Sequence, residues 1–163
     1  MDINEKIYQA VQEFKGLDHL IHFSLKYTRT TSVLKTVLEK IRNIEEYLIS
    51  ALYIYSKEKD STLKDENVIV LRSRIVCDYF KDDILTSNHE FYLKVKKLIR
   101  CESKCSGDFR KHVGLTFNFE EGDYVFDLKE AMEYYKKTRK IFRYILDKME
   151  VKPFQIDFED LTI

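Results

Sequence analysis

Residues that interrupt regular secondary structure are scarce in this chain. Its 163 residues include four glycines and one proline, Pro153, and so few helix breakers favour long helices. The same scarcity excludes the phosphate-binding loop and the dinucleotide-binding fingerprint in their usual forms, because both need several glycines close together. The sequence therefore argues against the nucleotide-driven enzymes that depend on those motifs.

Cysteines and long apolar runs are also limited. Cys77, Cys101 and Cys105 are an odd number, so they cannot form a complete set of disulfides, and the N-terminal residues lack the basic and apolar parts of an export signal. We therefore expect a reducing, cytoplasmic environment. No stretch approaches the roughly 18 consecutive apolar residues of a membrane-spanning helix, so we expect no membrane partner.

Hydrophobic periodicity predicts helices over most of the chain, most clearly over residues 31–57. Apolar residues recur there with the i, i+3, i+4, i+7 spacing of one helix face: Leu34, Val37, Leu38, Ile41, Leu48, Ala51, Leu52 and Tyr55. Charged residues between them, such as Arg42, Glu45 and Glu46, are expected to face solvent. This segment is the most clearly predicted single helix of the chain.

Two further helices are expected from apolar content. Residues 3–28 have a helical pattern, with a break or bend near Gly16 and Asp18. Residues 68–81 begin with a run that suits a strand, but their later spacing is helical. We therefore expect segment 68–81 to form a mostly buried helix.

Two tetrapeptides carry helix-start signals. Ser87–Glu90 matches a capping box, and Asp127–Glu130 has a related arrangement. In such a box the first side chain accepts a hydrogen bond from a free backbone N–H of the first helical turn. The two signals predict helices from residue 88 to about 103 and from 127 to about 150.

The only convincing β pattern lies between these two helices. Apolar and polar residues alternate before the turn at 120–123, and a second short run follows it, while 103–108 is expected to be a loop. We predict an all-α, up-and-down bundle of about five helices with one inserted β-hairpin (about 113–126). Residues 1–150 would form a single domain, and 151–163 a tail that is an edge strand, an arm over a neighbouring subunit, or disordered.

A local basic surface is one candidate site, although the formal net charge is zero. Binding to phosphates needs clustered cations rather than a net positive charge, and nearby tyrosines could stack on bases. The alternative is an ordinary solvent-exposed helix face whose positive charge is balanced by acidic neighbours. The candidate nucleic-acid-binding residues are Lys94, Lys97, Arg100, Arg110, Lys136, Arg139, Lys140 and Arg143.

A metal site is the second candidate. Cys101 and Cys105 have a spacing that zinc sites use, and His112 follows closely. Structural zinc sites usually have four ligands, and the fourth would have to come from His89 or Cys77. The alternative is a pair of reduced cysteines at the end of a helix, and we predict no cofactor.

Catalytic signatures are otherwise absent from the sequence. It contains no Gly-x-Ser-x-Gly nucleophile elbow, and contact between a cysteine and a histidine depends on the fold. His19 and His22 would share a helix face, but no Glu-x-x-His repeat of a di-iron bundle accompanies them. An enzymatic role is therefore less expected than a non-enzymatic one.

The order of elements, with a Tyr- and Lys-rich closing helix (DYVFDLKEAMEYYKKTRKIFRYI), is similar to uncharacterised archaeal helical proteins that resemble the HEPN superfamily. The resemblance covers residues 20–150 and implies a helical bundle, frequent dimerisation and, in many members, RNA cleavage or nucleotide binding. The superfamily's catalytic signature is an Arg followed four to six residues later by His. No Arg has that spacing before any of the four histidines, since Arg110 precedes His112 by only two residues, so the resemblance implies a non-nuclease member.

The sequence favours a non-enzymatic, cytosolic interaction or adaptor protein that self-associates, most simply as a homodimer. Its 11 tyrosines and 11 phenylalanines exceed what we expect a small core to bury. The alternative is an RNA- or DNA-binding protein that uses the basic residues above. A metal-dependent enzyme is the third reading.

Overall fold

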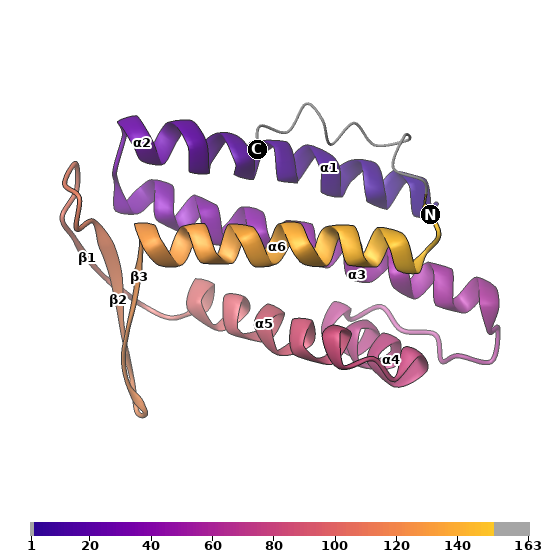
Figure 1. Cartoon of the computed structure of the whole chain (residues 1–163). Coiled ribbons are helices and arrows are strands. Elements are labelled where there is room, and N and C mark those ends of the chain that lie inside the picture. The colour runs from indigo at the N-terminus through magenta and orange to yellow at the C-terminus, as the bar shows by residue number, and fades with distance from the viewer. Residues whose placement is uncertain (1, 152–163) are drawn as a thin grey trace.

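The computed structural model describes residues 2–151, which form a bundle of helices with a small sheet at one end (Figure 1). The main helices are α1 (Ile3–His19), α3 (Thr31–Lys59), α4 (Ile69–Phe80), α5 (Asp83–Arg100) and α6 (Leu128–Lys148). The expected helical fold with an inserted hairpin is therefore confirmed in outline.

Helix α3 is the centre of the bundle. It contacts α1, α4, α5 and α6, and its predicted apolar stripe is buried from Leu34 to Leu52. Thr30 caps it, because the Thr30 side chain accepts a hydrogen bond from the Val33 N–H at 3.3 Å. Glu45 is completely buried, so the prediction that it faces solvent is wrong. Glu45 lies on the same helical line as Ile41, Leu48 and Leu52, which points into the bundle.

The first helix is not broken at Gly16. A π-helical turn (η1, Leu20–Ser24) and a short helix (α2, Leu25–Tyr27) continue directly from α1. Asp18 does not cap a new helix; it is buried, and its Oδ1 accepts a hydrogen bond from the Tyr135 hydroxyl at 2.5 Å. The distortion that the sequence suggested near Gly16 and Asp18 therefore takes the form of a π-helical turn beyond them.

Helices α4 and α5 differ from prediction in burial and in starting point. Only Ser73 and Val76 of α4 are fully buried, so the expectation of a mostly buried helix is wrong. Helix α5 begins at Asp83 rather than near residue 88. Asp82 is its cap, since Asp82 Oδ1 accepts from the N–H groups of Ile84 and Leu85, and the predicted capping box lies inside the helix.

The sheet has three antiparallel strands in the order β1–β2–β3: β1 (Lys104–Ser106), β2 (Gly114–Phe119) and β3 (Gly122–Asp127). The predicted hairpin corresponds to β2 and β3, and β1 is an additional strand in the segment that was expected to be a loop. The connection from β1 to β2 is tied to the start of α3, because the Phe109 N–H donates to the Arg29 carbonyl at 2.5 Å.

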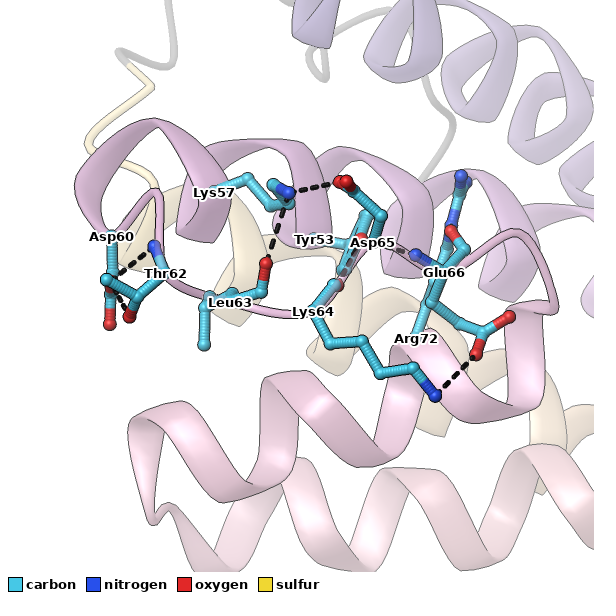
Figure 2. Close-up of polar contacts among 9 residues, drawn as sticks. All are labelled: Tyr53, Lys57, Asp60, Thr62, Leu63, Lys64, Asp65, Glu66 and Arg72. Carbon is cyan, nitrogen blue, oxygen red and sulfur yellow. Dashed lines mark hydrogen bonds and ion pairs between the residues drawn. The ribbon is translucent and has the colours of Figure 1, made fainter.

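The polar connection between α3 and α4 is held by Tyr53 and Lys57, as Figure 2 shows. The Tyr53 hydroxyl donates to the Lys64 carbonyl at 2.8 Å and accepts from the Glu66 N–H at 3.0 Å. Lys57 Nζ donates to the Leu63 carbonyl at 3.1 Å and pairs with Asp65. A segment that looks like a solvated linker in sequence is thus fastened to the helix before it.

Two further predictions concern the C-terminal tail and membrane-spanning helices. The predicted tail lies outside the described residues apart from Val151. No helix in residues 2–151 combines the length and hydrophobicity that crossing a membrane requires.

Candidate functional site

A groove between α5 and α6 is the main candidate site. Both helices pack on α3, but they approach each other much less (Figure 1). The space between them has a volume of about 580 Å³. The α5–α6 groove is lined by Ile84, Ser87, Asn88, Glu90, Phe91 and Lys94 of α5, and by Lys137, Lys140, Ile141 and Tyr144 of α6.

Helical geometry explains both walls. On α5, most lining residues follow i, i+3, i+4, i+7 spacing from Ile84 to Phe91, and on α6 the same spacing runs from Lys137 to Tyr144. Each wall is therefore one continuous face of a helix. Apolar side chains are part of both faces, and Ile84 remains 52% exposed.

Three lysines make the groove cationic. Lys94 Nζ lies 4.4 Å from the ring centroid of Tyr124, and Lys137 Nζ lies 5.6 Å from that of Phe91. Within residues 2–151, none of Lys94, Lys137 and Lys140 forms an ion pair with a carboxylate. Glu90 is the one acidic residue of the lining. The groove therefore carries positive charge that the described residues do not neutralise by direct pairing.

Asp82 lies two residues before Ile84, the first residue of α5 in the groove lining. Its Oδ2 accepts hydrogen bonds from the Tyr144 hydroxyl and, at 2.6 Å, from Lys148 Nζ. Burial alone would raise the pKa of Asp82, but these bonds and those from the Leu85 and Ile84 N–H groups outweigh it and hold the pKa at about 2. Asp82 thus joins the start of α5 to the end of α6.

Two tyrosine rings, Tyr124 and Tyr134, lie near Lys94 of the groove. The Tyr124 hydroxyl donates to Glu130 Oε2 at 2.7 Å and lies 2.7 Å from the Tyr134 hydroxyl. Burial raises the pKa of Tyr134 to about 12, although its hydrogen bond with Tyr124 acts in the opposite direction. These phenols stay neutral near pH 7, so Lys94 faces their rings and not a phenolate.

A buried carboxyl group lies behind the α5 wall. Asn88 Nδ2 donates to Glu45 Oε2 at 2.7 Å, while Glu45 Oε1 has no hydrogen-bond partner among residues 2–151. Burial raises the pKa of Glu45 to about 7, and the bond from Asn88 only partly opposes this. The groove lining is therefore linked through Asn88 to a group that titrates near neutral pH.

The predicted basic residues do not all converge on this groove. Lys94 and Lys140 do. Lys97 pairs with Glu121 at 3.1 Å, and Lys136 pairs with Glu133 at 3.7 Å. The remaining four lie elsewhere: Arg139 and Arg143 near Tyr135 on the α1 side of α6, Arg100 at the end of α5, and Arg110 between β1 and β2.

Sequence reasoning missed the apolar residues of the groove and did not include Lys137 among the candidate residues. The spacing of Lys137, Lys140, Ile141 and Tyr144 would have revealed one face of α6. Glu45 was missed too, although its place in an apolar stripe is visible in the sequence. Pairing of the two walls depends on the packing of both helices on α3, which no local pattern encodes.

The predicted metal ligands lie in the segment between α5 and β2. Cys101 follows the last residue of α5 and is half-buried, Cys105 lies in β1 and is exposed, and His112 precedes β2. Within residues 2–151, no three His, Cys, Asp or Glu side chains are grouped in a way that could hold a metal ion. The structure therefore adds no support to the metal hypothesis.

Comparison with known proteins gives no further guide to the site. The resemblance to the HEPN superfamily consequently stays a prediction. No protein-family model, no curated protein and no solved structure matches this chain at a significant level.

Proposed function

We propose that this protein is a non-enzymatic interaction protein whose α5–α6 groove binds an acidic, amphipathic segment of a partner protein. The observation that carries the proposal is a groove with apolar walls and three lysines that lack carboxylate partners among residues 2–151. Apolar side chains of the partner would bury against Ile84 and Ile141. Its carboxylates would pair with Lys137 and Lys140.

The form of the groove supports a peptide ligand. Grooves between two helices that present i, i+3, i+4, i+7 faces are a common receptor for an amphipathic helix. Charge complementarity at the rim speeds association and selects acidic partners, while the apolar floor supplies most of the affinity. The residues from Lys137 to Tyr144 span about 10 Å along α6, which is about two turns of a bound helix.

Nucleic acid is a weaker fit to this groove. Bases stack on free aromatic faces, but Lys137 Nζ lies 5.6 Å from the centroid of the Phe91 ring, and Lys148 Nζ lies 5.5 Å from that of the Tyr144 ring. Glu90 would also repel phosphates. An RNA- or DNA-binding role therefore remains the alternative, to be decided by experiment.

A fluorescence anisotropy titration tests the proposal. The probe is a labelled synthetic helix of about 16 residues, long enough to be partly helical, with Glu on one face and Leu and Phe on the other. We expect the wild-type protein to bind it, and Lys137→Glu with Lys140→Glu to weaken binding at least tenfold, roughly the loss expected when ion pairs become repulsions.

The matched control is Lys129→Glu with Lys136→Glu, which makes the same charge change on the same helix outside the groove. The proposal predicts near wild-type binding for this control, and equal losses in both double variants would contradict it. If single-stranded RNA of mixed sequence binds instead, with a steep salt dependence and a requirement for Lys137 and Lys140, the alternative replaces the proposal.

Self-association remains a separate part of the proposal. It is supported by apolar side chains at the start of α4 that the described residues leave partly uncovered, since Val68, its N-cap, is 54% exposed and Leu71 is 37% exposed. Sedimentation velocity should give a dimer for the wild type and a monomer for Leu71→Glu. A wild-type monomer at high concentration would contradict the prediction.

A further inference from the structure

A second pocket lies at the opposite side of α6, between this helix and the segment formed by η1 and α2. Its volume is about 310 Å³, and it is lined by Ile21, His22, Leu25, Lys26, Arg29, Leu128 and Met132. We propose that this pocket binds a small organic anion, with its charged head at Arg29 and Lys26 and its apolar body against the aliphatic wall. This site is independent of the α5–α6 groove.

Arg29 provides the strongest evidence for an anionic ligand. Its Nε is buried and has no hydrogen-bond acceptor among residues 2–151. A buried donor without a partner is costly, and more so when it is charged. The Arg29 carbonyl is held by the Phe109 N–H at 2.5 Å, so the backbone that carries this guanidinium is fixed. An acceptor from outside the chain would satisfy it.

Lys26 adds a second cation to the pocket, and His22 lies beside it in the lining. His22 is in the π-helical turn and Lys26 in α2, whereas Arg29 lies in the connection that follows α2. His22 is held in place by Tyr135, whose ring centroid lies 5.4 Å from that of His22 in an edge-on arrangement, and by Asp18, whose Oδ1 lies 3.5 Å from its Nε2. Lys26 is exposed and can close over a ligand. Arg29 on a fixed backbone and the exposed Lys26 together suit a small anion that enters from solvent.

The other wall sets the size and polarity of the ligand. Ile21 and Leu25 are buried, and Leu128 and Met132 are half-buried. A water molecule takes about 30 Å³ of liquid volume, so a bare phosphate ion would leave much of the pocket empty. The aliphatic lining therefore favours an anion that carries a short apolar group, such as an organic phosphate or carboxylate.

The backbone conformation beside the pocket also supports a ligand site. His22 lies within the π-helical turn Leu20–Ser24. Such turns are rare within α-helices and occur frequently at functional sites. Here the turn leads directly into α2, which carries Lys26, and Arg29 follows two residues after the end of α2, so the irregular backbone and both cations belong to one segment.

Titration of the ¹⁵N-labelled full chain with phenyl phosphate, benzoate and inorganic phosphate tests the site. We expect phenyl phosphate or benzoate to shift the amide signals of residues 21–29 and 128–132, with inorganic phosphate at least tenfold weaker. The tighter of the first two identifies the head group. Inorganic phosphate binding as tightly as both would overturn the apolar part of the proposal, and no binding by any of the three would overturn it all.

Two variants and a matched control assign the effect to the pocket. Arg29→Gln and the exposed Lys26→Gln should each weaken binding about tenfold, since each removes one charge-assisted hydrogen bond. Arg143→Gln, an exposed arginine of α6 outside the pocket, should leave binding unchanged. Wild-type affinity in both Arg29→Gln and Lys26→Gln would mean that water satisfies Arg29, and would refute the site.

Discussion

The two sides of the bundle are built differently. On the closed side, α1 packs tightly against α3, whereas on the open side α5 and α6 both pack on α3 but leave a groove between them. The α1–α3 contact is the most extensive between any two helices. Small or fully buried residues of α1, including Ala10, Phe14 and Leu17, face α3 or the core beside it. The facing positions of the α5–α6 groove instead include three charged side chains, Lys94, Lys137 and Lys140.

The difference shows how side-chain chemistry decides whether two helices meet. On the closed side, polar groups pair with each other: Lys40 Nζ lies 3.2 Å from Glu13 Oε2, which also accepts from Asn43 Nδ2 at 3.1 Å. On the open side, three cations have no carboxylate partner in residues 2–151, so closing the groove would bring like charges together without compensation. The first side stabilises the fold, and the second is available to a ligand.

Phe14→Ala should give the largest effect on the closed side. The Phe14 ring is 1% exposed, and its centroid lies 5.6 Å from both the Tyr135 and the Phe142 rings. Its removal leaves a cavity where three helices meet, and we expect the free energy of unfolding to fall by about 3–5 kcal/mol. Urea denaturation followed by circular dichroism measures it.

The open side supplies the matched comparison for that prediction. Ile84→Ala truncates a large apolar side chain of the groove that is 52% exposed, so we expect a loss of at most about 0.5 kcal/mol together with weaker binding of the acidic helix. A loss of several kcal/mol in Ile84→Ala would mean that the groove is part of the core.

The second prediction concerns the pH dependence that Glu45 creates behind the groove. Burial raises its pKa from an ordinary value of 4.5 to about 7, so the native state keeps a proton that the unfolded state releases. This stabilising contribution is complete below pH 4.5 and is lost as the pH rises through about 7. Stability should therefore fall by about 3 kcal/mol from pH 4.5 to pH 8 on account of this group.

Glu45→Gln isolates that contribution, because a glutamine oxygen can still accept from Asn88 but does not ionise. Urea denaturation of both proteins at several pH values should show a stability difference that grows in favour of the variant as the pH rises. Parallel curves for the two proteins across pH 4.5–8 would contradict the raised pKa.

Asp82→Ala, at the start of α5, should have a smaller effect. The change removes the cap of α5 and the bonds to Tyr144 and Lys148, and loss of a cap alone costs about 1 kcal/mol. Because the pKa of Asp82 is lowered to about 2, its contribution is present above its ordinary pKa of 3.8 and is lost as the pH falls towards 2.

The neighbouring Asp83 provides the control for this variant. It lies in the first turn of α5 and is exposed, so Asp83→Ala should cost only a few tenths of a kcal/mol, roughly the value of a charge near the helix dipole. The gap between the two variants, measured by urea denaturation at pH 7, should narrow at pH 2.5. Equal losses at pH 7 would refute the special role of Asp82.

Much of the helical architecture could be predicted from the sequence, because it depends on repeated local spacing. The stripe of α3 and the cap at Asp127, which accepts from the Glu130 N–H at 2.9 Å, are both visible there. The start of α5 was misplaced because Asp82 and Ser87 are both good caps. The choice of Asp82 is supported by its bonds to Tyr144 and Lys148, which are distant in sequence.

Strand β1 and the candidate site were less predictable, because both depend on contacts between segments that are distant in sequence. Strand β1 is three residues long and exposed, and it pairs with β2 through backbone hydrogen bonds, which leave no pattern in side chains. Six of the eight predicted cations lie outside the α5–α6 groove, since adjacent residues of one helix point in directions about 100° apart. Local spacing identifies the faces of a helix, but the packing partner decides which face lines a groove.

Gly16→Ala should have the smallest effect and tests how tightly the closed side is packed. A Cβ at this position would lie 3.3 Å from Lys40 Cε, the flexible end of a side chain, which can move by a few tenths of an ångström. Alanine is favoured over glycine within a helix by about 1 kcal/mol, so the small displacement of Lys40 should leave a net stabilisation of less than about 1 kcal/mol.

Thermal and urea denaturation of Gly16→Ala would measure this gain, and Gly16→Leu serves as its counterpart because a larger side chain cannot avoid Lys40. A clear loss of stability in Gly16→Ala would mean that the Lys40–Glu13 pair is rigid and that the α1–α3 contact tolerates no added atom at this point. The expected small gain would instead place the tight packing deeper in the contact, at Ala10 and Leu17, which are completely buried. The close approach of α1 and α3 would then depend on apolar packing in the interior, whereas the Lys40–Glu13 pair at the surface can adjust its position.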